Sequence, residues 1–269
     1  MEKELEPFII QLAGHRIRIF PRYEWIREYC KDYIIPDTGL GKEYLSDEVA
    51  GVTTTDLTVQ ISSDDIAYEC LHSDRDAQKN GQEPVMYTDA YLETLAVYRR
   101  IAEWMPMQNT LLFHGSVVAV DGQAYLFTAK SGTGKSTHTR LWREYFGDRA
   151  VMINDDKPLL QIREDGIYAY GTPWDGKHRL STNMSAPLSG ICILRRGADN
   201  SICRISAEDA YPMLVQQCYR PMDKVALGHT MCLLDRIKET VPCYELYCNM
   251  SEKAVETAYN GMKNHSGLS

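Results

Sequence analysis

The stretch "TAKSGTGKST" (Thr128–Thr137) decides the fold class of this chain. It follows "AYLFTA", which is typical of a buried strand, and precedes "STHTRLWREYF", which has the spacing of an amphipathic helix. A phosphate-binding loop reads G-x-x-x-x-G-K-[ST] in this context, and here Ala129 stands at the first glycine position. We interpret residues 129–136 as a Walker A-type P-loop. The alternative is a chance glycine-rich turn.

The loop predicts a nucleotide site, because its glycines let consecutive backbone N–H groups converge on phosphate oxygens at a helix N-terminus. In such a loop Lys135 reaches the β- and γ-phosphates, and Ser136 ligates Mg²⁺. We therefore expect ATP and Mg²⁺ as cofactors. The predicted nucleotide-binding residues are Ser131, Gly132, Thr133, Gly134, Lys135, Ser136 and Thr137.

A pair of carboxylates follows the next buried strand pattern, in "VMINDDKP". In a kinase, Asp155 and Asp156 would share Mg²⁺ binding with Ser136 and would accept the proton of the substrate hydroxyl. Adjacent residues on a strand point to opposite faces, so the two carboxylates are expected to have different roles. Spacing does not decide which of them is the base. The alternative is a solvated turn before Lys157.

The hairpin in front of the loop adds a histidine to this site. A two-residue turn at Asp121-Gly122 would pair Val120 with Gln123 and so fix the register of both strands. Counting back along the strands places His114 opposite Ala129, at the mouth of the phosphate loop. There it could hydrogen-bond phosphate or tune the base. The alternatives are a packed strand histidine, or a bulge that shifts the register.

The order "FHGSVVAVDGQAYLFTAKSGTGKST … INDDKP" resembles the catalytic domain of the HPr kinase/phosphorylase family, which has a phosphoenolpyruvate carboxykinase-like P-loop fold. The resemblance is specific over residues 111–158 and general to about residue 250. It implies that His114 is the active-site histidine, that Lys135 and Ser136 hold phosphate and metal, and that Asp155 and Asp156 are the catalytic acid pair.

The chain also departs from this family. Ala129-Lys130 replaces the usual Gly-Asp of the loop, and the glycine-rich stretch that the family uses with its protein substrate is not recognisable. The first hundred residues do not match the usual N-terminal domain. The resemblance therefore implies a related kinase with a different acceptor, a small hydroxyl compound such as free serine included.

A loop rich in glycine and charge, "GTPWDGKHRLST" (Gly171–Thr182), is the other candidate for the active site. Lys177 or Arg179 would neutralise charge on the transferring phosphoryl group. Trp174 would stack on a base or a substrate. The alternative is a solvated loop whose tryptophan packs on the core.

Composition excludes several classes of partner. A formal net charge of -8 argues against nucleic acid or an anionic membrane as the main partner. No apolar run is long enough to span a bilayer, and the start of the chain lacks a signal-peptide pattern. The eight cysteines form no C-x-x-C pair, which indicates reduced thiols in a cytoplasmic protein. The oligomeric state stays open, a homo-oligomer included.

Strand and helix patterns alternate along most of the chain, and two Asp-Gly turns join antiparallel strands. We therefore predict an α/β fold with a mixed sheet, built on a P-loop core of the HPr kinase/phosphoenolpyruvate carboxykinase-like type. Residues 1–83 are expected to form a small α+β N-terminal region, and residues 84–269 the P-loop kinase-like domain. The polar stretch His72–Pro84 is the predicted linker.

The leading functional hypothesis is an ATP-dependent kinase that phosphorylates a serine-type hydroxyl of a protein or a small molecule. The resemblance leaves a reverse phosphorolysis activity open. The second hypothesis is a nucleotide-binding regulatory or peptide-recognition module with little catalysis. The third is an NTPase without a phosphoryl acceptor.

Overall fold

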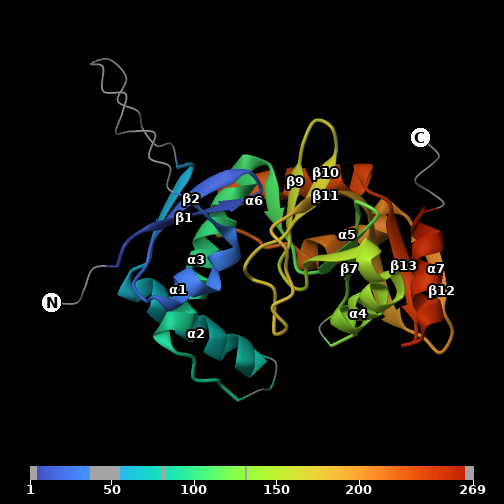
Figure 1. Ribbon diagram of the computed structural model, residues 1–269, viewed down its shortest axis with the longest axis horizontal. Coiled ribbons are helices and arrows are strands. Elements are labelled where there is room, and N and C mark those ends of the chain that lie inside the picture. Colours follow the sequence, from blue (N-terminus) through green and yellow to red (C-terminus); the bar gives the residue numbers. More distant parts are fainter. Residues whose placement is uncertain (1–4, 37–54, 80, 82, 131, 264–269) are drawn as a thin grey trace. The chain divides into compact units, whose positions relative to one another are not determined.

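The structure, a computed structural model, describes residues 5–36, 55–79, 81, 83–130 and 132–263 (Figure 1). The chain divides into two compact units, residues 1–101 and 102–269. The boundary expected at residues 83 and 84 stays a prediction. The linker prediction is wrong for residues 72–79, because the helix α2 covers Ser63–Lys79.

A capping box begins α2, and it explains why this polar stretch is helical. The Ser62 Oγ accepts a hydrogen bond from the Asp65 N–H at 3.1 Å. The Asp65 carboxylate in turn accepts from the Ser62 N–H at 3.0 Å. Two of the helix's unpaired N-terminal donors are thereby satisfied locally, and the helix continues through a region that polarity alone marks as a linker.

The first unit contains a four-stranded sheet in the order β3-β1-β2-β4. Ala13 and Gly14 have φ of 49° and 84° and close the β1–β2 hairpin. The strands are β1 (Phe8–Leu12), β2 (His15–Phe20), β3 (Ile34–Ile35) and β4 (Leu57–Gln60). The helices are α1 (Trp25–Tyr29), α2 and α3 (Asp89–Trp104), of which α3 ends beyond the unit's last residue.

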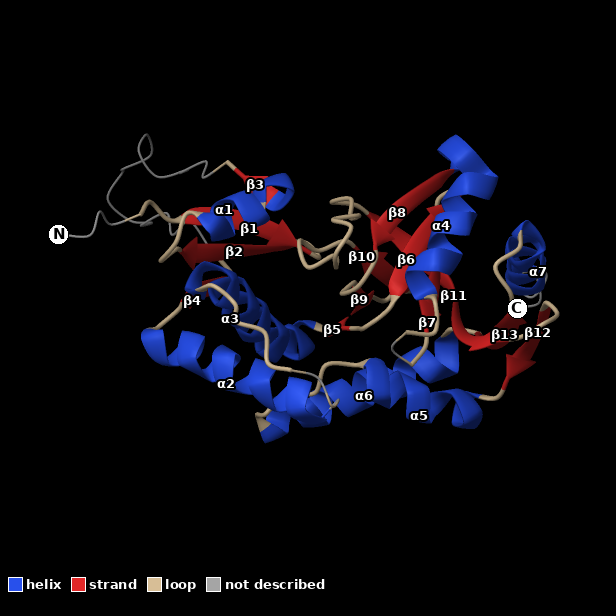
Figure 2. Cartoon of the chain, turned by 90° about the horizontal axis from the view of Figure 1, so that it is seen from below, coloured by secondary structure: helices blue, strands red, loops and turns tan. Residues whose placement is uncertain are grey.

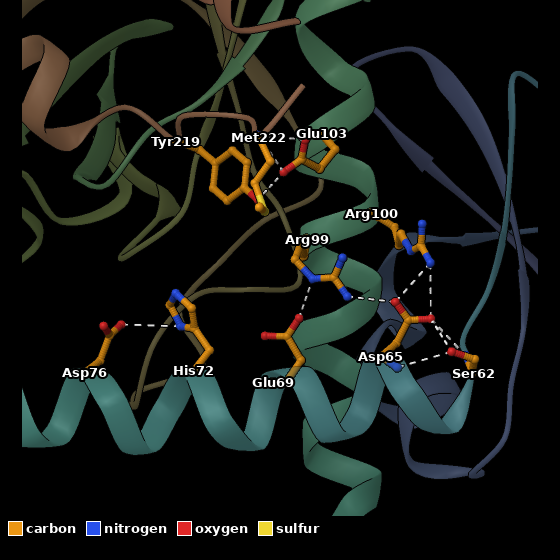
Figure 3. Close-up of polar contacts among 10 residues, drawn as sticks. All are labelled: Ser62, Asp65, Glu69, His72, Asp76, Arg99, Arg100, Glu103, Tyr219 and Met222. Carbon is orange, nitrogen blue, oxygen red and sulfur yellow. Dashed lines mark hydrogen bonds and ion pairs between the residues drawn. The ribbon is translucent and has the colours of Figure 1, made fainter. Parts of the chain in front are cut away.

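A cluster of charged side chains joins α2 to α3 within the first unit (Figure 3). Arg99 donates to Glu69 at 2.5 Å and to Asp65 at 2.8 Å. Arg100 also donates to Asp65, at 2.9 Å. We call these four residues the α2–α3 charge cluster. Its carboxylates are buried and each accepts hydrogen bonds from a guanidinium, so it stabilises the packing of the two helices.

The second unit is built on a nine-stranded mixed sheet, which agrees with the predicted sheet type. The main path runs β5-β9-β10-β11-β7-β6-β8, and β13 pairs with β11 and β12. The long strand β11 lies parallel to both β7 and β13, whereas the other pairings are antiparallel. The strands are β5 (Thr110–Leu112), β6 (Ser116–Val120), β7 (Gln123–Thr128), β8 (Ala150–Asn154), β9 (Leu159–Ile162), β10 (Ile167–Tyr170), β11 (Ser185–Arg196), β12 (Ser201–Ile205) and β13 (Cys243–Cys248).

Helices cover both faces of this sheet (Figure 2). Val118 and Phe127 belong to the core cluster of α4 and α7, while Val117 and Leu126 belong to the cluster of α5 and α6. Neighbouring strand residues therefore enter different cores, as the two-residue period of a strand requires. The helices are α4 (Lys135–Phe146), α5 (Ala207–Gln217), α6 (Lys224–Thr240) and α7 (Glu252–Lys263).

The β6–β7 hairpin has the predicted turn and register. Asp121 and Gly122 both have positive φ, 51° and 78°, as a type I′ turn requires. Val120 pairs with Gln123, and the ladder continues to Ser116 and Phe127. It ends there, so His114 and Ala129 lie just beyond the paired strands.

The stretch "LLFHGSVVAV" contributes to two strands, β5 and β6. β5 pairs with β9, whereas β6 pairs with β7 and β8. Gly115 lies at the break, and its N–H donates to the Asp156 carbonyl at 3.1 Å. A Cβ on Gly115 would lie 3.1 Å from the Phe127 carbonyl oxygen, so this close approach favours glycine. At this break Gly115, the neighbour of His114, is hydrogen-bonded to Asp156 of the acid pair.

Candidate functional site

Two glycines shape the described part of the glycine-rich loop (residues 129–136). Gly132 has φ of 76° and Gly134 has φ of 119°, a region that residues with a side chain rarely adopt. Thr133 closes the turn, since its N–H and its Oγ1 both donate to the Lys130 carbonyl, at 3.2 and 2.7 Å. Gly134 is the N-cap of α4, and the helix begins at Lys135.

The N-terminus of α4 has no cap of its own. Within the part of the chain that the structure describes, no side chain accepts from its first N–H groups, and its first turn carries no acidic residue. Among the described residues, the N–H groups of Lys135, Ser136 and Thr137 have no acceptor. These donors and the positive end of the helix dipole form a site for an anion, which the Lys135 ammonium reinforces.

A cavity of about 430 Å³ lies against this helix end. Around it the fold collects residues from four separate parts of the second unit. Its walls include His114, Gly132, Gly134, Lys135, Ser136, Thr137, Asp155, Asp156, Gly176, Lys177 and His178. Most of the residues predicted from the sequence therefore lie around one space, although their roles stay predictions.

His114 is held in this cavity through its backbone. Its N–H donates to the Gln217 carbonyl at 2.7 Å, and its carbonyl accepts from the Thr128 Oγ1 at 3.1 Å. The His114 Nε2 lies 3.3 Å from the Asp156 Oδ1. The histidine therefore contacts one carboxylate of the acid pair directly.

Asp156 lies among positive charges at the wall of the cavity. The Lys157 Nζ is 3.7 Å from its Oδ1. Burial favours the protonated carboxyl, but the hydrogen bond from His114 and the charges of Lys157, His114 and Lys135 outweigh it. Together they hold the pKa of Asp156 below its ordinary value. Asp156 is therefore an ionised carboxylate at neutral pH.

Lys135 is the cation that faces the acid pair from the helix end. Burial lowers the pKa of its ammonium, while the charge of Asp156 acts in the opposite direction. A partly desolvated cation interacts more strongly with an anionic ligand than a fully hydrated one. The lysine is thus suited to a phosphate in the same cavity.

Asp155 has a different environment from its neighbour, as the alternation along a strand predicts. Its side chain is buried, and its Oδ1 accepts from the Ser116 Oγ at 2.9 Å. The same hydroxyl also lies 3.0 Å from the Asp155 carbonyl. Ser116 therefore fixes the orientation of Asp155, a contact that the sequence did not reveal.

Asn154 is a second residue that sequence reasoning missed. Its buried Oδ1 accepts from the Asp156 and Lys157 N–H groups, at 2.8 and 2.6 Å. Its Nδ2 donates to the Thr172 carbonyl at 3.0 Å and to the Thr172 Oγ1 at 3.1 Å. One amide thus joins the acid turn to the loop that carries Lys177. The available signal was a polar residue at the end of an apolar strand.

The predicted loop Gly171–Thr182 divides into two parts. Lys177 and His178 line the cavity, and Gly176 lies so close that a Cβ there would be 3.3 Å from the Asp156 Cβ. Arg179 instead contacts the buried Asp175 at 3.1 Å and donates to the Pro173 carbonyl at 2.8 Å. Of the two predicted cations, the structure brings Lys177 to the cavity wall.

The remaining predicted residues are Trp174, Thr133 and Ser131. Trp174 is 5% exposed and packs in the protein interior, which matches the alternative rather than a stacking role. Thr133 faces a neighbouring cavity instead of the one with the acid pair. Ser131 lies outside the described residues. Its part in the phosphate site stays a prediction.

The donors around the cavity fit a magnesium ion that arrives with a phosphate ligand. Mg²⁺ takes oxygen ligands, keeps several waters and uses one or two carboxylates beside substrate phosphates. Ser136, Asp155 and Asp156 supply such oxygens around the cavity. The described residues contain no group of three or more histidines, cysteines or carboxylates that could hold a metal.

Composition led to two expectations, one about the cysteines as reduced thiols and one about segments that span a bilayer. All eight cysteines are free thiols. Burial raises the pKa of the Cys218 thiol to about 12 and that of Cys243 to about 11, so both are protonated at neutral pH. Over the described residues, every helix is too short or too polar to cross a bilayer.

Comparisons with known proteins add a distant structural likeness. No protein-family model and no curated protein matches the chain. Among solved structures, it is similar to the Hpr(Ser) kinase/phosphatase from Coxiella burnetii, with 9% identity and a TM-score of 0.35. The match covers 57% of this chain and 89% of that chain. At this level of similarity, the roles of individual residues must be argued from the site itself.

Proposed function

We propose that this protein is an ATP-dependent, Mg²⁺-dependent kinase that transfers the γ-phosphoryl group to a serine-type hydroxyl of a protein or a small molecule. One observation carries the proposal. The uncapped N-terminus of α4, with Lys135, faces the acid pair and His114 across a single cavity. An anion site opposite an ionised carboxylate is the arrangement that phosphoryl transfer to a hydroxyl needs.

In this proposal the phosphates bind at the N–H groups of Lys135, Ser136 and Thr137. Lys135 neutralises phosphate charge from the helix end, and Lys177 does so from the Gly171–Thr182 loop. Mg²⁺ bound with the nucleotide would be held by Ser136 and the acid pair and would neutralise charge on the phosphates.

The environments of the two carboxylates suggest a division of labour. Asp155 is buried, and one of its oxygens already accepts from Ser116, which suits an oriented metal ligand. Asp156 is more exposed to the cavity and is kept ionised by its cationic neighbours. We assign proton acceptance from the substrate hydroxyl to Asp156, with His114 orienting its carboxylate.

The test measures ADP formation from Mg·ATP with and without hydroxyl acceptors, free serine and a serine-containing peptide among them. A kinase forms ADP in an acceptor-dependent manner, and Asp156→Asn abolishes most of that turnover. Acceptor-independent phosphate release supports the simple NTPase instead. If nucleotide binds while neither Asp155→Asn nor Asp156→Asn changes turnover, the protein is a nucleotide-binding module.

A further inference from the structure

A second cavity adjoins the glycine-rich loop on its other side. It has a volume of about 490 Å³ and shares Gly132, Gly134 and Thr137 with the cavity of the acid pair. Such a volume is within the usual range for small-molecule sites. Because the loop forms a wall of both cavities, a ligand whose phosphates lie at the N-terminus of α4 can extend into the second one.

The second cavity has apolar walls and an apolar rim. Leu141 of α4 and Leu194 of β11 contribute to its walls. Met250 stands at its edge with 79% of its surface exposed. An exposed thioether beside two leucines suits a flat ring that packs against it, since methionine makes favourable contacts with aromatic systems.

His138 of α4 lies in the wall of this cavity and has one ring nitrogen without a partner among the described residues. Its ring is 3% exposed, and its Nε2 accepts from the Trp142 Nε1 at 3.0 Å. Burial lowers the pKa of His138 to about 4, so the ring is neutral at physiological pH. With Nε2 acting as acceptor, the neutral ring carries its hydrogen on Nδ1. No described residue accepts from that buried Nδ1.

Two arginines, Arg195 and Arg196, also line the second cavity. Arg196 donates to the Gly132 carbonyl at 2.6 Å, so its guanidinium contacts the loop. None of the described residues that line this cavity is an aspartate or a glutamate. A ligand here therefore meets N–H donors and apolar walls, and it should supply acceptor atoms on a flat ring.

We propose that the second cavity binds the purine ring of the nucleotide, with the His138 Nδ1–H donating to a ring acceptor and Met250 covering one face of the ring. The inference rests on the proposed function, because it assumes that the phosphates occupy the neighbouring cavity. Purines carry acceptor nitrogens along their edges and offer a large face for apolar contact. The ring would also satisfy a buried donor from which no described residue accepts.

The test compares the binding of Mg·ATP with that of Mg·tripolyphosphate by calorimetry. Met250 is exposed, so its variants should not disturb folding. We expect the wild type to bind ATP at least about tenfold more tightly than tripolyphosphate, and Met250→Gln to weaken ATP binding about fivefold through lost apolar contact. Met250→Leu should behave like the wild type, and tripolyphosphate should bind all three proteins equally.

Histidine-selective ¹⁵N NMR provides a second readout for the His138 contact. The His138 Nδ1 resonance should shift with ATP and stay unchanged with tripolyphosphate. Equal affinity for the two ligands, with no effect of Met250→Gln, would place the ring outside this cavity while leaving the phosphate site intact. If neither ligand binds, the proposed function fails together with the inference.

Discussion

Two regions of the molecule bury carboxylates against cations, and they do so differently. In the α2–α3 charge cluster (Asp65, Glu69, Arg99 and Arg100) both carboxylates accept hydrogen bonds from guanidinium groups at 2.5 to 2.9 Å (Figure 3). In the candidate site Asp156 makes looser contacts, at 3.3 Å with His114 and 3.7 Å with Lys157, and its side chain is 34% exposed.

The two regions resemble each other in the pKa of their carboxylates but differ in their surroundings. The pKa of Asp65 is lowered although burial opposes the shift, and the same holds for Asp156. A lowered pKa alone therefore does not identify a functional carboxylate. What distinguishes Asp156 is that it lines a cavity that also holds an uncapped helix N-terminus. The following predictions test whether this difference is functional.

The largest effect is expected at Asp156. Asp156→Asn keeps the size of the side chain but removes the proton acceptor, so turnover should fall about 10²- to 10⁴-fold. Asp65→Asn is the matched change in the charge cluster, and it should leave the turnover of the folded protein unchanged. Steady-state rates of ADP formation measure both. Equal losses in the two variants would remove the distinction between the regions.

The next largest effect concerns stability and belongs to the charge cluster. Arg99→Met leaves Glu69 buried without a cation, which should lower the free energy of unfolding by about 3–5 kcal/mol. Urea denaturation measures the loss. The double variant Arg99→Met/Glu69→Leu replaces the whole pair by apolar groups and should recover much of it. If the single variant is as stable as the wild type, the pair does not hold the helices together.

We expect the stability of the protein to depend on pH because of His138, a buried histidine whose pKa is lowered by burial. Its pKa falls from an ordinary 6.5 to about 4 on folding, so the folded state binds fewer protons than the unfolded state between these values. The resulting stability is complete above pH 6.5 and is lost as the pH falls toward 4, by about 3 kcal/mol. Unfolding of the wild type and of His138→Gln across this range isolates the contribution. Parallel curves for the two proteins would contradict it.

The smallest effect is expected for Asn154, whose amide joins the acid turn to the loop that carries Lys177. Asn154→Ala removes the hydrogen bonds between the acid turn and Thr172. The loop that carries Lys177 is then held less firmly beside the acid pair. We expect kcat to fall about tenfold while stabilisation by Mg·ATP persists. Thr172→Val keeps the main-chain carbonyl that Asn154 contacts and should lose less. A loss of nucleotide binding instead of rate would give Asn154 a different role.

The sequence predicted the parts of the site that depend on local chemistry. The Asp-Gly turn determines the β6–β7 register, which brings His114 near the loop, and the acid pair follows β8 as expected. The resemblance to the HPr kinase/phosphorylase family pointed to the same residues. These features depend on turn geometry and on strand ends, which residue types reveal directly.

Features that depend on contacts distant in sequence were not predicted. The break between β5 and β6 arises because the Gly115 N–H bonds Asp156, and the amide of Asn154 reaches Thr172. The linker prediction at α2 failed for a local reason. It relied on the polarity of the segment and did not take into account the Ser62–Asp65 capping box, which begins a helix there. The Gly115 and Asn154 contacts join residues whose proximity the residue types alone do not encode.

The most direct test of the central claim is thermal unfolding with and without millimolar Mg·ATP. We expect ATP to raise the Tm of the wild type and of the control Lys79→Ala, which alters an exposed lysine of α2. Lys135→Ala should show no such rise, because it removes the cation at the uncapped helix end. A wild-type Tm that does not respond to Mg·ATP, or an equal rise in Lys135→Ala, would contradict the assignment of this helix end as the phosphate site.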